Sequence, residues 1–531
     1  MTPTANAMQI GSLIRRAAQQ FGDATCLTEG ERRISFAEFD AATDRLGNAL
    51  LALGLTPGER VGVRMPNSIG CLVAYYALAK CGLVRVGLNT RETLDDHRYK
   101  LGESGSRGVI HAGIDGLGTE IDIGPDRLTR LIAEGDATPC TVDRPLDAPY
   151  RLGFTGGTTG KPKGVTLTTG GELWEISSFL SDLMPDMREG DTFLHAAPIA
   201  HASGAFFLPA IVRGVHSLIM PKFDAQEFVE LGHASGATLT FLVPTMLAMI
   251  LEAPGVDGAD LRFRRIAYGA SPIAPRLLQR GEARFGRVFA QVYGQAESPM
   301  VISCLKPEDH DRIGSCGRPF PCADVAVFDD DDNPLPPGEV GEIVTRGPQT
   351  MAYYWNRPEA TEKVFRNGWL HTGDVGSMDE DGFFYILDRK NDMLISGGFN
   401  IYPREVEDVL LAFEGVVEAA VVGLPDEKWG DRVHAVVAGR PDLDTDALLA
   451  QLQATQGHRR MAGAAQERCQ QDPAPRSPRT PDRRKRGIEP HASQASGAAR
   501  HRHQEARDRG RGGRDYRPGP GRRAADCRRR R

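Results

Sequence analysis

Residues 155–164 read Thr-Gly-Gly-Thr-Thr-Gly-Lys-Pro-Lys-Gly, and this stretch decides the fold of the chain. It combines four glycines, three threonines and two lysines within ten residues. Glycine lets backbone amides approach a ligand closely, threonine hydroxyls donate hydrogen bonds, and lysine adds a mobile positive charge. The composition therefore predicts a loop that binds a polyphosphate.

The loop differs from the common P-loop, GxxxxGK[ST], because Pro162 follows Lys161 where that motif needs Ser or Thr. Its flanks, YRLGF at 150–154 and GVTLT at 164–168, both read as extended chain. We therefore expect the loop to join two strands, whereas a P-loop opens a helix. The alternative is a flexible hairpin tip without a ligand, and the two lysines favour the phosphate-binding interpretation.

Three further motifs follow in order. Residues 293–297 read YGQAE, residues 369–374 read WLHTGD, and residues 388–392 read DRKND, followed by SGGFNIYP at 396–403. With the loop, they resemble the signatures of the adenylate-forming superfamily, which includes acyl-CoA synthetases, luciferases and the adenylation domains of peptide synthetases. The resemblance covers roughly residues 9–455. One such motif alone would be weak evidence for the family, whereas four motifs in the family's order are specific to it.

The periodicity of the chain predicts an α/β fold. A strand at 60–64, a helix at 68–80 and a strand at 83–88 alternate as in a parallel sheet, and the rhythm recurs over 226–292. Short strands at 325–328 and 341–345 indicate a β-barrel-like part. At 531 residues the chain should hold more than one core.

We expect three parts. Residues 1–388 form a large N-terminal adenylate-forming domain of several subdomains, with α/β layers and the barrel-like part. Residues 389–456 form a small, mobile α+β C-terminal domain that is truncated, with the boundary at the polar run 388–392. Residues 457–531 form an Arg-rich, disordered tail.

Composition excludes several classes of protein. Hydrophobic residues make up 40% and charged residues 25%, as in ordinary globular proteins. No 18-residue apolar stretch occurs, so we expect no membrane span, and residues 1–20 lack the apolar region of a secretory signal. Nine cysteines without a CxxC spacing predict reduced thiols and a cytoplasmic protein.

The C-terminal tail has an unusual charge. Residues 457–531 contain 21 Arg, one Lys and eight acidic residues, a net charge of +14, so the first 456 residues carry −20. The tail has no Leu, Val, Phe or Trp and cannot bury enough surface to offset its ordering entropy. It could be a solvated tail or a nucleic-acid-binding arm. The abrupt loss of Leu, Val and Lys favours a frame-shifted translation of a GC-rich gene.

The resemblance implies two half-reactions. A carboxylate attacks the α-phosphate of ATP to give an acyl-adenylate and pyrophosphate, and a thiol, usually that of CoA, then displaces AMP. The implied cofactors are ATP, Mg²⁺ and CoA. The residues implied to hold the β- and γ-phosphates belong to the loop and are Thr155, Thr158, Thr159, Gly160 and Lys163. Glu297 is the implied Mg²⁺ ligand, since Mg²⁺ takes one or two carboxylates beside phosphates and water; the alternative is a surface carboxylate.

Further roles follow from the same resemblance. Asp374 would accept hydrogen bonds from both ribose hydroxyls, unless it is a turn residue, and Arg389 would reach the ribose or phosphate, unless it is a solvated surface charge. Tyr293, next to Gly294, would stack on adenine, unless it packs in the core. The backbone opposite the adenine would come from Gly269, Ala270 and Ser271. His201 would lie beside the substrate carboxylate, although a lone histidine is more often structural, and the slim Gly397-Gly398 loop would line the thiol tunnel.

The acyl pocket implied by the resemblance is mostly apolar. It would be lined by Phe206, Phe207, Leu242, Val243, Met246, Tyr268 and Met300. The segments show no buried cation and no aspartate for an α-amino group. They favour a fatty or aryl acid over an amino acid.

One family feature is missing. The lysine of a C-terminal PxxxxGK-type motif does not occur, and Lys485 lies in a different context. We expect adenylation to be weak or lost, because this step demands placement of the charge, while thiolation of a preformed acyl-adenylate could persist.

The leading hypothesis is an acyl-CoA synthetase of fatty acid metabolism. Its rivals are a ligase that loads a carrier protein and a non-catalytic, nucleic-acid-associated protein acting through the basic tail. We expect a small carboxylic acid and CoA as partners, with no membrane and no nucleic acid, and leave a homodimer open.

Overall fold

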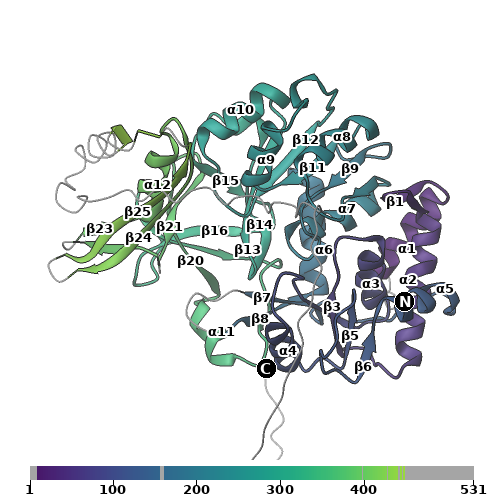
Figure 1. Cartoon of the computed structure of the whole chain (residues 1–531). Coiled ribbons are helices and arrows are strands. Elements are labelled where there is room, and N and C mark those ends of the chain that lie inside the picture. The colour runs from purple at the N-terminus through teal and green to yellow at the C-terminus, as the bar shows by residue number, and fades with distance from the viewer. Residues whose placement is uncertain are drawn as a thin grey trace, which may run out of the picture. The chain divides into compact units, whose positions relative to one another are not determined.

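A computed structural model of the chain describes residues 9–155, 161–390, 392–396, 399–426, 429–440, 443–444 and 447–448. In these residues it shows three β-sheets, of fourteen, seven and four strands, with helices between and around them (Figure 1). The predicted α/β fold class is confirmed. The tip of the glycine–threonine loop and the Arg-rich tail lie outside the described residues.

One half of the largest sheet is parallel. Its parallel strands are, in sheet order, β1 (Thr25–Glu29), β10 (His216–Ile219), β9 (Thr192–His195), β11 (Leu239–Leu242), β12 (Arg265–Gly269) and β13 (Phe289–Gln295). β2 (Arg32–Ser35) closes the edge beside β1 in antiparallel pairing. The helices α8 (Ala225–Ser235), α9 (Pro244–Leu251) and α10 (Pro275–Phe285) connect the strands, and Figure 1 shows them beside β11 and β12.

The other half of this sheet is antiparallel. After β13 the strands run β14 (Ser298–Leu305), β15 (Ser315–Pro319), β21 (Phe384–Arg389), β20 (Trp369–Met378), β17 (Val340–Arg346) and β16 (Asp324–Phe328), with β19 (Phe365–Arg366) also on β20. This is the β-rich material that the short strands after residue 324 predict. The change of direction falls between β13 and β14, and the turn there contains Glu297.

The seven-stranded sheet holds the phosphate-binding stretch. Its order is β18 (Tyr353–Tyr354), β8 (Lys163–Thr168), β7 (Pro149–Thr155), β4 (Val84–Gly87), β3 (Arg60–Arg64), β5 (Gly108–His111) and β6 (Ile121–Ile123). β7 and β8 pair antiparallel with Thr155 opposite Lys163. The prediction that the loop joins two strands is confirmed.

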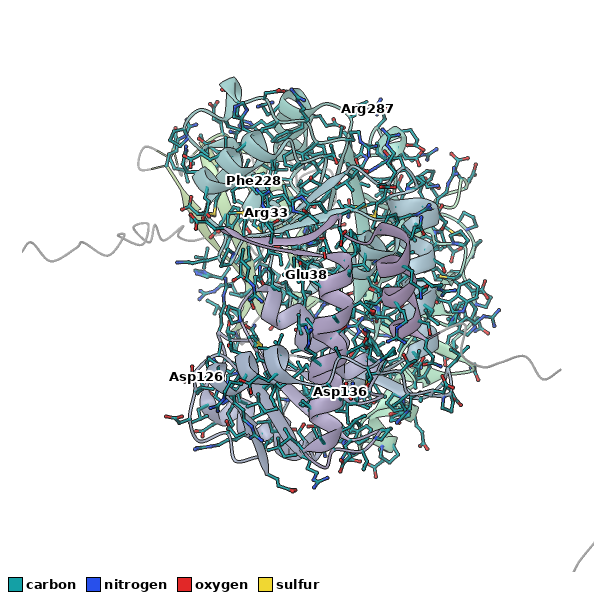
Figure 2. The ribbon with its side chains drawn as sticks, turned by 90° about the vertical axis from the view of Figure 1, so that its right-hand side faces the viewer. Arg33, Glu38, Asp126, Asp136, Phe228 and Arg287 are labelled. Carbon is teal, nitrogen blue, oxygen red and sulfur yellow. The ribbon has the colours of Figure 1, made fainter. Side chains whose placement is uncertain are left out.

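Helices complete these layers. Their bounds are α1 (Ile10–Phe21), α2 (Phe36–Ala52), α3 (Ile69–Lys80), α4 (Leu94–Ser104), α5 (Pro125–Glu134), α6 (Thr169–Ser178), α7 (Phe207–Val212) and α11 (Pro358–Val364). α2 begins with a capping box, in which Glu38 N–H donates to Ser35 Oγ and Ser35 N–H donates to a Glu38 carboxylate oxygen. Figure 2 labels Glu38 near the start of this helix and Asp136 near its far end. α3 is apolar on every side because nearly all of it is buried.

The four-stranded sheet has its own core. The chain leaves β21 at Arg389 and enters β22 (Leu394–Ser396), β23 (Phe399–Ile401), α12 (Pro403–Leu411), β24 (Val416–Asp426) and β25 (Gly430–Gly439). Ile401, Val406, Leu410, Val421 and Val437 pack together there.

The described part of the chain contains neither a membrane-spanning helix nor a disulfide. No helix in it combines the length and apolar character needed to cross a bilayer. The seven cysteines found in it are all free thiols.

A buried ion cluster joins the first three helices. Lys80 has a fully buried side chain, and its Nζ lies 2.5 Å from Asp40 Oδ1 and 2.8 Å from Asp44 Oδ1. Asp44 also accepts from Arg15 Nη2 at 3.0 Å. Gly11 of α1 lies directly against the Lys80 stem, where a Cβ would come within 2.9 Å of Cγ. Since each buried charge here has an opposite partner, removal of the lysine would leave carboxylates uncompensated.

We predict that Lys80→Ala lowers the free energy of unfolding by about 3–5 kcal/mol, because the buried Asp44 loses its main countercharge. Chemical denaturation followed by circular dichroism measures this. Lys222→Ala, at an exposed lysine before α8, is the matched control and should leave stability unchanged. Equal stability of the two variants would contradict the prediction.

Candidate functional site

The foot of the β7–β8 hairpin presents two lysines on aromatic faces. Lys163 Nζ lies 4.5 Å from the ring centre of Tyr354, and Lys161 Nζ lies 5.2 Å from that of Tyr99. Tyr99 Oη donates to the carbonyl of Pro162 at 3.0 Å. Within the described residues neither ammonium group has a carboxylate partner, so both positive charges are available to an anion.

Glu297 lies next to this hairpin. Its Oε1 accepts a hydrogen bond from Tyr354 Oη at 2.5 Å, and its backbone carbonyl accepts from Met351 N–H at 2.7 Å. Tyr354 is the same ring that carries the Lys163 ammonium group. The structure therefore brings Thr155, Lys163 and Glu297 together, through a tyrosine that the sequence analysis did not identify.

Asp374 lies on β20, opposite Arg389 of β21, and is 5% exposed. Its Oδ2 accepts from Tyr293 Oη at 2.5 Å, and its Oδ1 lies 3.4 Å from Arg389 Nε. Burial raises the pKa of Asp374, while the Tyr293 hydroxyl and the Arg389 guanidinium act in the opposite direction. The Arg389 side chain is 63% exposed and so faces solvent on its other side.

A cavity of about 890 Å³ opens in front of these groups. Six predicted site residues line it, namely Ala270, Ser271, Tyr293, Gly294, Asp374 and Arg389. Gly294 is required by close packing, since a Cβ there would lie 2.2 Å from Met300 N. Gly269, at the end of β12, lies behind the lining, where a Cβ would lie 2.5 Å from Val292 O.

His201 lies apart from this cavity lining. It precedes a 3₁₀ turn over Ala202–Phe206, and its Nε2 is 3.0 Å from Asn89 Nδ2. Desolvation lowers the pKa of His201, so the ring is neutral at pH 7. No contact in the described part of the chain connects it to Glu297 or Asp374.

Other predicted residues fall into two groups. Thr158, Thr159, Gly160, Gly397 and Gly398 lie outside the described residues. The residues expected around the acyl group are buried or partly buried in apolar cores. Phe206, Leu242, Met246, Tyr268 and Met300 belong to one core together with partly buried Val243, and Phe207 belongs to the neighbouring core.

Sequence reasoning missed a third carboxylate, which lies behind Asp374 and does not line the cavity. Glu342, on β17, is 8% exposed, and its Oε1 accepts from the backbone N–H of Gly373 at 3.0 Å. It thereby holds the backbone of β20 directly before Asp374, where the register between β17 and β20 shifts. In the sequence it is one polar residue within the strand pattern GEIVTR, and only the pairing of β17 with β20 gives it this role.

The side chains at the hairpin suit a cation that binds together with a phosphate ligand rather than to the protein alone. In the described part of the chain no three His, Cys, Asp or Glu side chains form a metal cluster. Glu297 offers one carboxylate, of which Oε2 accepts no hydrogen bond from the described residues. One carboxylate plus phosphates and waters is the coordination typical of Mg²⁺ in nucleotide sites, so the residues fit that ion.

Comparisons with known proteins match two family models and several relatives. The family model described as "AMP-binding enzyme" matches residues 14–355, and "AMP-binding enzyme C-terminal domain" matches residues 405–467. The chain is 36% identical over 501 residues to a medium/long-chain-fatty-acid–CoA ligase, FadD8, of Mycobacterium tuberculosis, with 88% of this chain and 86% of that protein covered. It is 38% identical over 456 residues to a feruloyl-CoA synthase of Amycolatopsis sp, with 83% and 91% covered.

The fold is also similar to that of a solved CoA synthetase. The o-succinylbenzoate CoA synthetase of Bacillus subtilis, in complex with its acyl-adenylate intermediate, superposes with a TM-score of 0.77 at 30% identity. The match covers 85% of this chain and 92% of that one.

We predict that Tyr293→Phe raises the pKa of Asp374, because the hydroxyl that stabilises the carboxylate is removed. Adenosine, which has no phosphate to titrate, is the probe. Its affinity should fall as the pH drops through the raised pKa of Asp374, and in Tyr293→Phe the fall should begin at a higher pH. Isothermal titration calorimetry at a series of pH values, from about pH 4, the ordinary pKa of an aspartate, up to pH 8, measures this.

Tyr385→Phe is the control for this experiment, since it removes a tyrosine hydroxyl 3.1 Å from Asp379, and neither residue lines the cavity. It should leave the pH profile unchanged. Identical profiles for Tyr293→Phe and the wild type would contradict the assigned role of the Tyr293 hydroxyl.

Proposed function

The chain belongs to the AMP-binding enzyme family, and we propose that it is an acid–thiol ligase for an apolar carboxylic acid, aliphatic or aromatic. It activates the acid with ATP and forms the CoA thioester, so ATP, Mg²⁺ and CoA are its cofactors. One observation carries the proposal. Residues 293–297, which cover the end of β13 and the turn to β14, are linked to Lys163 through Glu297 and Tyr354, and to Asp374 through Tyr293.

The roles of the residues follow from their chemistry. Thr155 and Lys163 hold the β- and γ-phosphates together with the loop, because positioning and neutralisation of charge are the main requirements of phosphoryl-type transfer. Glu297 would hold Mg²⁺, which neutralises phosphate charge when bound. Asp374 offers two acceptor oxygens to the vicinal ribose hydroxyls, and Arg389 adds a positive charge at the same cavity.

The class of acid is inferred from the apolar residues after β9. Phe206, Leu242 and Met246 are buried in one core and carry no charge that would pair with an ammonium group. Relatives named for medium- and long-chain fatty acids and for ferulate have substrates of this kind. We assign His201, neutral at pH 7, a place beside the substrate carboxylate, and Gly397 and Gly398 a place beside the thiol.

We further propose that adenylation by this chain is weak. Beyond residue 456 the sequence contains one lysine, Lys485, flanked by Arg484 and Arg486 rather than preceded by glycine. A charge that is not placed at the α-phosphate gives little catalysis of the first step. Thiolation needs no such lysine and should persist.

Three further assignments, of domains, compartment and partners, complete the proposal. Residues 1–388 and 389–456 act as separate domains, with the boundary where β21 ends and β22 begins. The free thiols of the seven described cysteines suit the reducing cytoplasm. Because the substrates are small molecules, nucleic acid plays no part in the reaction; a homodimer is compatible with it.

We predict that pyrophosphate release by this chain is slower by about 10²-fold or more than release by a variant whose residues after 456 follow the family pattern. A panel of fatty and aryl acids with ATP and Mg²⁺ tests this. Both chains should convert a synthetic acyl-adenylate and CoA into thioester at similar rates, since only the first step needs the lysine.

The arms of this experiment separate the alternatives. Equal pyrophosphate release by the two chains would contradict the weak-adenylation proposal. Release of AMP that needs a carrier protein instead of CoA would favour the carrier-loading ligase. Asp374→Ala in the restored chain is the control, and it should weaken binding of both ATP and the acyl-adenylate, which carry the same ribose, and so reduce both steps.

A further inference from the structure

Tyr354 touches both charged groups that face the triphosphate in the proposed function. Its side chain is buried, with the residue 4% exposed. Its hydroxyl donates to Glu297 Oε1 at 2.5 Å, and its ring centre lies 4.5 Å from Lys163 Nζ. One side chain therefore links the carboxylate of one sheet to the lysine of another.

The backbone around Tyr354 makes the same connection. Met351 N–H donates to the carbonyl of Glu297 at 2.7 Å. Ala352 N–H donates to Thr166 O at 2.9 Å and Trp355 N–H to Gly164 O at 2.7 Å, so the segment is bonded along β8. Segment 351–355 thus fixes the Glu297 turn against the strand that begins with Lys163.

We propose that Tyr354 is a positioning residue that holds the Glu297 carboxylate ready for the magnesium–nucleotide and keeps it in register with Lys163. The inference rests on the proposed function and names a residue that this function does not yet use. A free glutamate side chain loses rotamer freedom when it binds a cation, whereas a side chain already held by a hydrogen bond loses less. The oxygen that accepts from Tyr354 is Oε1, which leaves Oε2 for the cation.

A purely structural role would not require the hydroxyl. A phenylalanine ring would fill the same volume and would still lie under the Lys163 ammonium group. The hydroxyl instead donates to a single acceptor, the carboxylate assigned to the metal. The effect of the hydroxyl can therefore be measured apart from the effect of the ring.

The test is ATP binding to the full chain, measured by calorimetry with Mg²⁺ and with EDTA in its place, so that no turnover is needed. Tyr354→Phe should reduce the gain in ATP affinity that Mg²⁺ provides by about three- to tenfold, the contribution of one ordinary hydrogen bond. Binding in EDTA should be unchanged. Tyr353→Phe, next to it on β18 and 39% exposed, is the matched control and should behave as the wild type.

Two further variants locate the effect. Tyr354→Leu also removes the ring, so it should weaken ATP binding in EDTA as well, because Lys163 loses its support. In a Glu297→Gln background Tyr354→Phe should cause no further loss of the Mg²⁺ effect, since the two residues act through one carboxylate.

Three results would overturn the inference. They are an unchanged Mg²⁺ effect in Tyr354→Phe, an equal loss of binding with and without Mg²⁺, and failure of Tyr354→Phe to fold, which would make the hydroxyl a requirement of stability. Failure of the proposed function looks different. In that case the wild-type chain itself would not bind ATP under either condition.

Discussion

The site depends on two tyrosine–carboxylate hydrogen bonds, one buried and one partly buried, made by the end of β13 and the turn that follows it. Tyr293 donates to Asp374, and four residues later Glu297 accepts from Tyr354. A carboxylate that is taken out of water needs a partner, and these hydroxyls supply one without neutralising the charge. The end of β13 is thereby bonded to β20, and the turn from β13 to β14 is bonded to β18. Glu297 keeps Oε2 for a ligand, and both carboxylates keep a negative charge.

Much of this architecture could be predicted because its signals are local. The hairpin around residues 155–163, the capping box of Ser35 and Glu38, and helix α3 are all decided by neighbours within a few positions. The resemblance also implied one nucleotide for Asp374, Arg389 and Tyr293, and these three residues line one cavity. That Asp374 lies opposite Arg389 comes from the pairing of β20 with β21, which the sequence analysis did not predict.

The connecting residues could not be predicted, since their partners lie far away in the chain. Tyr354 and Glu297 are 57 positions apart, and Gly373 and Glu342 are 31 apart. Neither pair repeats with a helical or strand period. Lys80 could not be predicted for the same reason. A lysine in the last turn of a helix usually interacts with the helix dipole at the surface. Here the side chain is fully buried and paired with Asp40 and Asp44 of α2.

The charge of the chain makes the local arrangement of lysines decisive. Residues 1–456 carry −20, whereas ATP and CoA are anions. At physiological ionic strength exposed charges are screened beyond about 8 Å, so the net charge matters less than the charges next to the ligand. Lys80 and Lys100 are each paired with carboxylates, but Lys161 and Lys163 lie on tyrosine rings instead. An aromatic face holds an ammonium group in place while leaving its charge unneutralised. The hairpin can therefore attract a triphosphate to a protein that is acidic overall.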